Sequence, residues 1–227
     1  MKKMLKGISI ILIIASTVIL LTGCGKEKEE TPKTTPNEEV NVENNVEEQK
    51  DNSTEEFSMG KWNNGVYENK FLGLKFKLPD GWTYSSDEEI AKTMNVGKEL
   101  LNDDQKVAAE IANLTSVYYI MANNPNTGDN ISIMTEKPLM EATTEYYLSQ
   151  LKSQLSSVKS MEYKIGEVTK EKVANIEFDV LTVTAKMSGI ELTQKYYIHK
   201  MDKYFLDIIV TDVSGKDDIK NITTYFE

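Results

Sequence analysis

The 227-residue chain contains no arginine, a single cysteine and a single histidine. Without arginine it has no guanidinium for bidentate phosphate contacts, and its formal net charge is −10, so nucleic acid is not expected as a partner. With Cys24 alone, neither an internal disulfide nor a multi-cysteine zinc site can form. The folded part must therefore be stabilised by its core.

That single cysteine follows a basic and then an apolar segment. Three lysines within the first six residues precede an apolar run from Ile8 to Leu20. The run has the length of the apolar core of a secretory signal. It is shorter than the roughly 20 residues of a transmembrane helix, so a single-pass anchor is the less favoured alternative.

The sequence Leu21-Thr-Gly-Cys24 resembles the lipobox of bacterial lipoproteins. The resemblance implies a signal peptide over 1–23, cleaved before Cys24, and a diacylglyceryl group with fatty acids such as palmitate on Cys24. Two acyl chains make membrane anchoring stable. We therefore expect a lipid-anchored protein on the extracytoplasmic face of the cell membrane. Loss of Lys2, Lys3 and Lys6 would change the formal charge from −10 to −13.

Residues 24–58 differ in composition from everything that follows them. After Cys24, acidic residues outnumber lysines eleven to four in 25–58, and only three valines and Phe57 are sizeable apolar residues. Such a segment cannot bury enough apolar surface to fold, so we expect a disordered, solvated tether. A binding tail is the alternative reading of its acidity.

The remaining residues, 59–227, are enough for one domain with a substantial core. Apolar residues alternate with polar ones in most of this region, which predicts strands, and recur at helical spacing in a few segments. An antiparallel sheet with helices packed on it, an α+β fold, is favoured. The expected strands are 65–69, 72–78, 117–122, 130–135, 164–170, 175–186, 190–199 and 203–211; the expected helices start at Ser86, pass through 107–114, span 143–158 and close the chain through Ile219, Ile222 and Phe226.

A family resemblance accompanies this order of elements. The residues Tyr67-x-Asn69, Gly73-Leu-Lys-Phe76 and Leu78-Pro-x-Gly-Trp82, with the later run of strands, look like the PsbP-like domains of small bacterial lipoproteins. The resemblance implies an α-β-α sandwich used for binding and assembly, and it brings no catalytic residues. From the residues themselves, Trp82 is expected to be a buried core anchor, because the turn before it returns it onto strand 72–78.

Few residues in the sequence suggest a catalytic or metal-binding site. His199 is the only base for a Ser-His-Asp triad, but no Gly-x-Ser-x-Gly elbow accompanies it, so an exposed histidine at a strand end is favoured. Asn124, Asn126 and Asp129 resemble a calcium loop in their oxygens, yet the twelfth-position glutamate is missing and a hairpin loop is favoured. We expect no metal and no cofactor.

Paired tyrosines occur three times and could line a ligand groove. Neighbours on a strand point to opposite faces, so ordinary packing is favoured. The pairs are Tyr118-Tyr119, Tyr146-Tyr147 and Tyr196-Tyr197.

Three functional classes remain open at this stage. A non-enzymatic, membrane-anchored binding or assembly module with a protein partner leads. A small-ligand or metal-binding lipoprotein comes second, and a deep, polar-lined pocket would favour it. A hydrolase is third, and a cluster of carboxylates would favour it.

Overall fold

The computed structural model describes residues 57–90, 92, 116–138, 140–158, 162–187, 189–213, 215 and 221–227. The signal segment, Cys24, the expected helix through 107–114 and Ile219 lie outside the described residues. Within the described part, no helix is long and apolar enough to cross a membrane.

The described elements form two antiparallel sheets. A three-stranded sheet has the order β1-β2-β3, and a seven-stranded sheet has the order β4-β5-β6-β10-β9-β8-β7. The elements are β1 (Lys61–Asn63), β2 (Val66–Asn69), β3 (Leu74–Lys77), β4 (Thr83–Tyr84), β5 (Ser116–Asn123), β6 (Asn130–Glu136), α4 (Thr144–Ser157), β7 (Glu162–Val173), β8 (Ile176–Met187), β9 (Ile190–Met201), β10 (Tyr204–Asp212) and the 3-10 helix η1 (Ile222–Tyr225).

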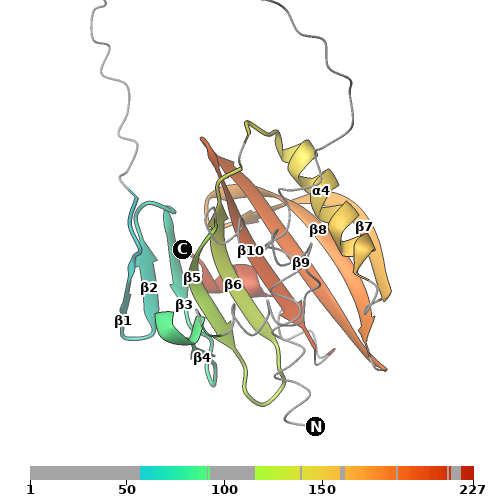
Figure 1. Ribbon diagram of the computed structural model, residues 1–227. Coiled ribbons are helices and arrows are strands. Elements are labelled where there is room, and N and C mark those ends of the chain that lie inside the picture. Colours follow the sequence, from blue (N-terminus) through green and yellow to red (C-terminus); the bar gives the residue numbers. More distant parts are fainter. Residues whose placement is uncertain are drawn as a thin grey trace, which may run out of the picture.

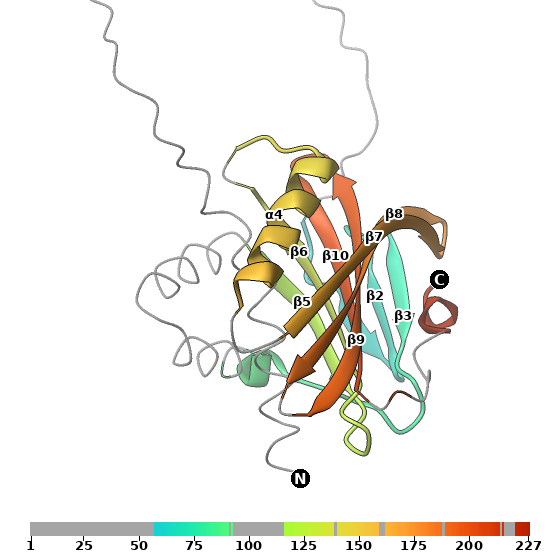
Figure 2. The same cartoon turned by 90° about the vertical axis from the view of Figure 1, so that its right-hand side faces the viewer.

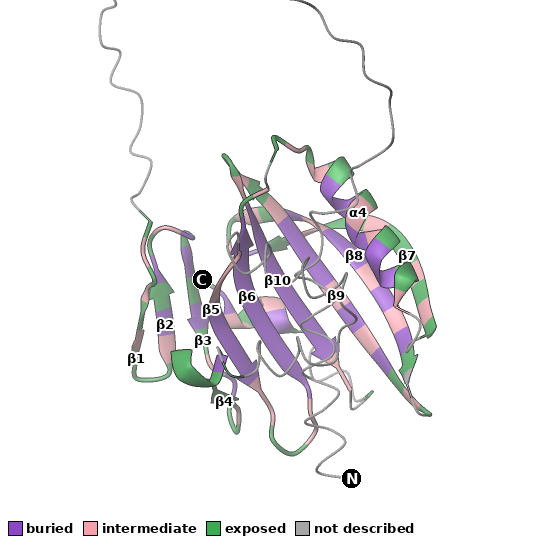
Figure 3. Cartoon of the chain, in the orientation of Figure 1, coloured by how far each residue is buried: buried purple, intermediate pink, exposed green. Residues whose placement is uncertain are grey.

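Both faces of the large sheet are covered. Helix α4 lies against one face and the small sheet against the other, as Figures 1 and 2 show. The central strands are consequently buried and the β7 edge is mostly intermediate or exposed (Figure 3). The predicted class, an antiparallel sheet with helical packing, is confirmed. Among the described residues, the face opposite α4 is covered by the small sheet and η1.

The core on the small-sheet side is aromatic. Phe76 of β3, 1% exposed, lies 5.0 Å from the Phe226 ring and 6.3 Å from Trp62. Trp82 packs against this core but is only half-buried, so the prediction of a fully buried anchor is wrong. The Pro79 turn, closed by the Trp82 N–H donating to Pro79 O at 3.1 Å, leaves part of the ring in solvent.

The chain enters the domain slightly earlier than its composition suggests. Phe57 lies 5.5 Å from the Phe71 ring, and Asn69 Nδ2 donates to Ser58 O at 2.9 Å. These two residues, which the sequence places in the tether, therefore contact the domain. Strand β1 was not predicted, because three residues are too few for a periodic signal.

The predicted helix starts are reproduced where they are described. Ser86 and Glu89 form a capping box: the Glu89 N–H donates to Ser86 Oγ at 3.3 Å, and the Ser86 N–H donates to Glu89 Oε2 at 2.8 Å. At the end of the chain, Ile222 and Phe226 are buried as expected, with a single 3-10 turn between them.

Candidate functional site

Helix α4 positions the candidate site, and its own sequence fixes its start. Thr143 is the N-cap, and its Oγ1 accepts a hydrogen bond from Tyr146 N at 3.3 Å. The helix buries Tyr147, Leu148 and Leu151 against the large sheet. Tyr147 belongs to a buried acidic cluster, and its neighbour Leu148 lines an open cleft.

The acidic cluster consists of Glu136, Tyr147 and Asp207, hereafter the acidic triad. Glu136 on β6 pairs in register with Phe205 on β10, so Asp207, two residues further along, lies on the same face. The Tyr147 hydroxyl oxygen lies 2.8 Å from Glu136 Oε2 and 2.5 Å from Asp207 Oδ2. All three side chains are 1% exposed.

The two contacts of the Tyr147 hydroxyl favour a triad that holds an extra proton. A tyrosine hydroxyl has one hydrogen to donate, so only one of the two short contacts is a Tyr147 donation. The other contact requires a carboxyl O–H that donates to the Tyr147 oxygen. At least one of Glu136 and Asp207 is therefore a neutral acid in this arrangement.

The electrostatics of the triad agree with this count. Burial raises the pKa of Asp207 to about 7, although the hydrogen bond from Tyr147 opposes the shift. Burial also raises the pKa of Glu136 well above its usual range, and the nearby Asp207 charge raises it further. Among the described residues, Asp207 Oδ1 has no hydrogen-bond partner, which makes full ionisation still less favourable.

The triad is the carboxylate cluster that a hydrolase would need, but its surroundings do not suit hydrolysis. A hydrolytic carboxyl pair leaves space for a water or a substrate between its members. Here the Tyr147 hydroxyl occupies that position, and the Phe205 ring stacks on Tyr147 with centroids 4.2 Å apart. The Tyr147 hydroxyl and the Phe205 ring thus fill the space between the two carboxyls.

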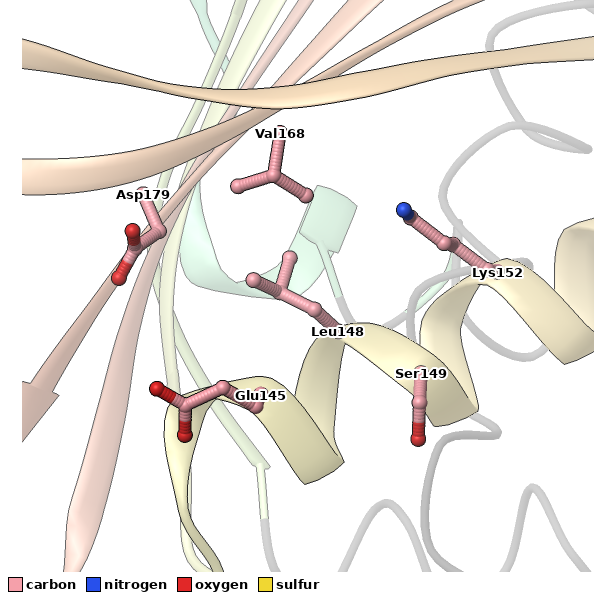
Figure 4. A pocket seen from close by; sticks show the side chains of 6 residues that line it. All are labelled: Glu145, Leu148, Ser149, Lys152, Val168 and Asp179. Carbon is pink, nitrogen blue, oxygen red and sulfur yellow. The ribbon is translucent and has the colours of Figure 1, made fainter.

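Beside the triad, an open cleft of about 280 Å³ separates α4 from β7 and β8. Figure 4 shows Leu148 of α4 and Val168 of β7 pointing toward one another across it. Charged and hydroxyl side chains surround this apolar floor. They are Glu145, Ser149 and Lys152 on α4 and Asp179 on β8.

A β-bulge places Val168 in the cleft. Tyr163 and Ile165 face the helix, and the register of β7 then shifts between Ile165 and Val168, so that the even-numbered Val168 faces the helix as well. Gly166 allows this, because a Cβ there would lie 2.7 Å from the Thr182 carbonyl oxygen.

The cleft rim carries both signs of charge. Lys170 Nζ lies 3.1 Å from Asp179 Oδ1 and 3.2 Å from Glu177 Oε1, and its hydrogen bond to Asp179 is the main reason that its pKa is raised. Hydrogen bonds to the backbone and to Thr143 at the start of α4 lower the pKa of Glu145. Glu145 is therefore ionised at neutral pH.

A second hollow, of about 310 Å³, lies at the other side of the helix start. Phe205 and Ala142 contribute apolar walls, and three exposed lysines line it. These are Lys137 after β6 and Lys200 and Lys203 at the β9–β10 turn.

His199, which was considered for catalysis, and the loop residues Asn124, Asn126 and Asp129, which were considered for metal binding, take part in hydrogen bonds within the domain. His199 Nδ1 lies 2.9 Å from the Glu177 carbonyl oxygen near the end of β9, which is not a Ser-His-Asp arrangement. In the β5–β6 loop, Asp129 Oδ1 accepts the Val213 N–H at 2.8 Å, and Asn124 Oδ1 accepts the Asn126 N–H at 3.0 Å. In the part of the chain that is described, no group of three potential metal-binding His, Cys, Asp or Glu side chains occurs.

In each tyrosine pair, the two side chains have different surroundings. Tyr196 belongs to the core under α4 and Tyr197 to the core on the opposite face. Tyr147 is buried, whereas Tyr146 is 45% exposed. Tyr119 reaches the core opposite α4 together with Ile120, because a bulge in β5 shifts the register there.

Sequence reasoning missed the acidic triad, although a signal was present. Glu136 ends the otherwise uncharged strand run 130–136, and Asp207 interrupts an apolar run in β10. A charged residue inside an apolar strand pattern is rarely buried unless it is paired or neutralised. The pattern thus marked both residues, but not that they would meet.

Comparison with known proteins found structural likeness only. No protein-family model and no curated protein matches the sequence. Cyanobacterial PsbP from Synechocystis is similar in fold (TM-score 0.43, 9% identity, covering 71% of this chain and 90% of that one). A Bacteroides thetaiotaomicron protein is also similar (TM-score 0.35, 11% identity, covering 68% of this chain and 44% of that one).

A third similar structure is LpqN of Mycobacterium tuberculosis, described as involved in cell envelope biogenesis (TM-score 0.36, 11% identity, covering 66% of this chain and 75% of that one). At TM-scores below 0.5 and identities near 10%, these likenesses do not indicate a function for this chain.

Proposed function

We propose that this chain is a lipoprotein anchored through Cys24 on the extracytoplasmic face of the membrane, and that its domain is a non-enzymatic module that binds a partner protein in the cleft between α4 and β7–β8. The sequence Leu21-Thr-Gly-Cys24 supports the anchor. The cleft supports the binding role.

The composition of the cleft is the observation that carries the proposal. It combines an apolar floor, Leu148 and Val168, with a rim of both charges. Protein interfaces have this anatomy, an apolar centre surrounded by polar groups that fix the orientation of the partner. A side chain such as leucine from a partner would displace water from the floor, while Lys152 and Asp179 would pair with polar groups beside it.

In-cell photocrosslinking from inside the cleft tests the proposal. A photoreactive residue replaces Ser149, which is exposed at the rim and has its hydroxyl hydrogen-bonded only to the Tyr146 carbonyl. The matched control position is Asn126, exposed in the β5–β6 loop at the opposite end of the sheet. We expect one discrete crosslinked protein from position 149 and none from position 126.

A second variant separates specific capture from proximity. Val168→Lys places a charge on the half-buried cleft floor, and it should abolish the crosslink from position 149 while the thermal unfolding midpoint shows that the domain is still folded. If position 149 captures nothing, or captures the same proteins as position 126, the cleft is not the binding site.

A further inference from the structure

The two ends of the large sheet differ in charge. The strand pairing places the tip of the β9–β10 turn, the end of β6 and the β2–β3 turn at one end, and the β5–β6 loop, the capping box and the start of β9 at the other. Exposed lysines lie at both ends, Lys70, Lys137, Lys200 and Lys203 at the first and Lys77, Lys164 and Lys186 at the second, so the two ends differ in their acidic residues. The opposite end carries exposed Asp80, Asp87, Glu88, Glu89 and Glu191.

The first end, hereafter the lysine-bearing end, is also where the described part of the chain begins, at Phe57. The Phe57 ring lies 5.5 Å from Phe71, Phe71 lies 5.7 Å from Tyr204, and Lys203 Nζ lies 5.6 Å from the Tyr204 ring centroid. These contacts form a chain that runs from Phe57 through Phe71 and Tyr204 to Lys203 in the β9–β10 turn.

Large apolar side chains are exposed beside these lysines. Met140 is 71% exposed, Phe57 49% and Met59 44%. Among the described residues, the lysines form no ion pairs that would neutralise them. Two exposed acids, Glu141 and Asp202, line the same hollow as three of these lysines, and Glu177 at the start of β8 pairs with Lys170, so the four lysines outnumber the unpaired acids named beside them.

We propose that this end of the domain, defined by Lys70, Lys137, Lys200 and Lys203 with Phe57 and Met140, docks onto the anionic phospholipid headgroups of the membrane to which the chain is anchored. The proposal rests on the proposed lipid anchor. A lysine near an anionic surface contributes enough that its loss lowers the docked-to-undocked ratio about fivefold. Exposed phenylalanine and methionine side chains can insert at the headgroup level, adding apolar burial.

The geometry suits an orienting contact rather than tight independent binding. The anchor keeps the domain near the membrane, so a weak contact is populated through a high effective concentration. An anionic membrane repels the acidic residues of the opposite end. The orientation with the lysine-bearing end toward the membrane is therefore favoured. In that orientation the α4 cleft, which lies on a face of the sheet rather than at its end, stays open to a partner.

The experiment uses the full acylated chain reconstituted in vesicles. Met140→Cys carries a fluorophore that lipid-borne spin labels quench on contact, and Asn126→Cys carries the same fluorophore at the opposite end. The parent chain, whose only thiol is acylated, is the labelling blank. Vesicles of phosphatidylcholine alone are compared with vesicles in which phosphatidylglycerol replaces part of it.

We expect quenching at position 140, and not at position 126, in the anionic vesicles only. Raising the ionic strength from about 0.01 M to about 1 M, which shortens the Debye length from about 30 to about 3 Å, should remove it. Adding inorganic phosphate at constant ionic strength should leave it unchanged if a lipid surface, not a small-anion site, is recognised.

Charge reversal provides the matched variants. Lys137→Glu, Lys200→Glu and Lys203→Glu together should lower the docked-to-undocked ratio by about 100-fold or more. Three exposed lysines near the other end, Lys77, Lys164 and Lys186, changed to Glu in the same way should lower it far less. Unfolding midpoints of both variants confirm that they fold.

Three outcomes overturn the docking proposal: equal quenching in neutral vesicles, equal quenching at both label positions, or an equal effect of the two charge reversals. Flotation of the chain with the vesicles is recorded in parallel. A chain that floats without quenching at position 140 is anchored but not docked, whereas one that does not float contradicts the anchor itself.

Discussion

Tyr147 and Asp207 are 60 residues apart in the chain, yet the Tyr147 hydroxyl oxygen lies 2.5 Å from Asp207 Oδ2 inside the core. Glu136 shares the same hydroxyl from the neighbouring strand. The helix is thus joined to two central strands through a group that holds an extra proton. This makes the stability of the domain depend on pH.

We predict that the free energy of unfolding falls as the pH rises from about 4 to about 8. Burial raises the pKa of Asp207 from 3.8 to about 7 in the folded chain, so between these values the folded chain binds more protons than the unfolded chain. The stabilisation is complete below about pH 4 and is lost as the pH passes about 7. For one group, the shift corresponds to roughly 4 kcal/mol.

Urea unfolding at several pH values measures this dependence. Glu136→Gln with Asp207→Asn keeps the shapes of both side chains and removes their titration, so its profile should be much flatter over the same range. A parent profile that is flat, or that rises with pH, would show that both carboxyls are ionised in the folded chain.

Tyr147→Phe should destabilise the domain by about 1 to 3 kcal/mol. The ring can still stack on Phe205, but the carboxyls of Glu136 and Asp207 both lose their hydrogen bond to the Tyr147 hydroxyl in a dry environment. Tyr146→Phe, one residue earlier and 45% exposed, is the control and should change stability by less than about 0.5 kcal/mol. Equal effects of the two substitutions would contradict the buried triad.

Phe76→Ala should cost about 3 to 5 kcal/mol, because this fully buried ring joins the small sheet to Phe226 and Trp62. Trp82→Ala should cost clearly less, since its ring is half-buried at the margin of the same core. Chemical denaturation of both variants gives the two differences. A larger loss for Trp82 would mean that it, and not Phe76, is the anchor.

Local patterns predicted local structure well. The helix expected over 143–158 is α4, which begins after its N-cap Thr143 and buries Leu148, Leu151 and Leu155. Val158, at the expected end of the helix, is the half-buried C-cap residue. The strands after Tyr163 were predicted within two or three residues, because their alternation and the turns between them are visible in sequence.

The candidate site was not predictable because it depends on contacts between distant segments. Glu136 and Asp207 meet only because β10 inserts between β6 and β9, and no local pattern specifies that strand order. Val168 faces the cleft because of a bulge at Gly166, whose need for glycine arises from the neighbouring strand. Trp82 was misjudged for the same reason, since the amount of core available to cover it is a tertiary property.

Fatty-acid labelling of the chain in growing cells tests the anchored-module account most directly. Cells are fed an alkyne-bearing fatty acid, and the parent chain is compared with Cys24→Ala by click detection and membrane fractionation. We predict a labelled parent in the membrane fraction and an unlabelled Cys24→Ala variant, because the two acyl chains are attached through this thiol. An unlabelled parent, or a Cys24→Ala variant labelled as strongly as the parent, would contradict the account.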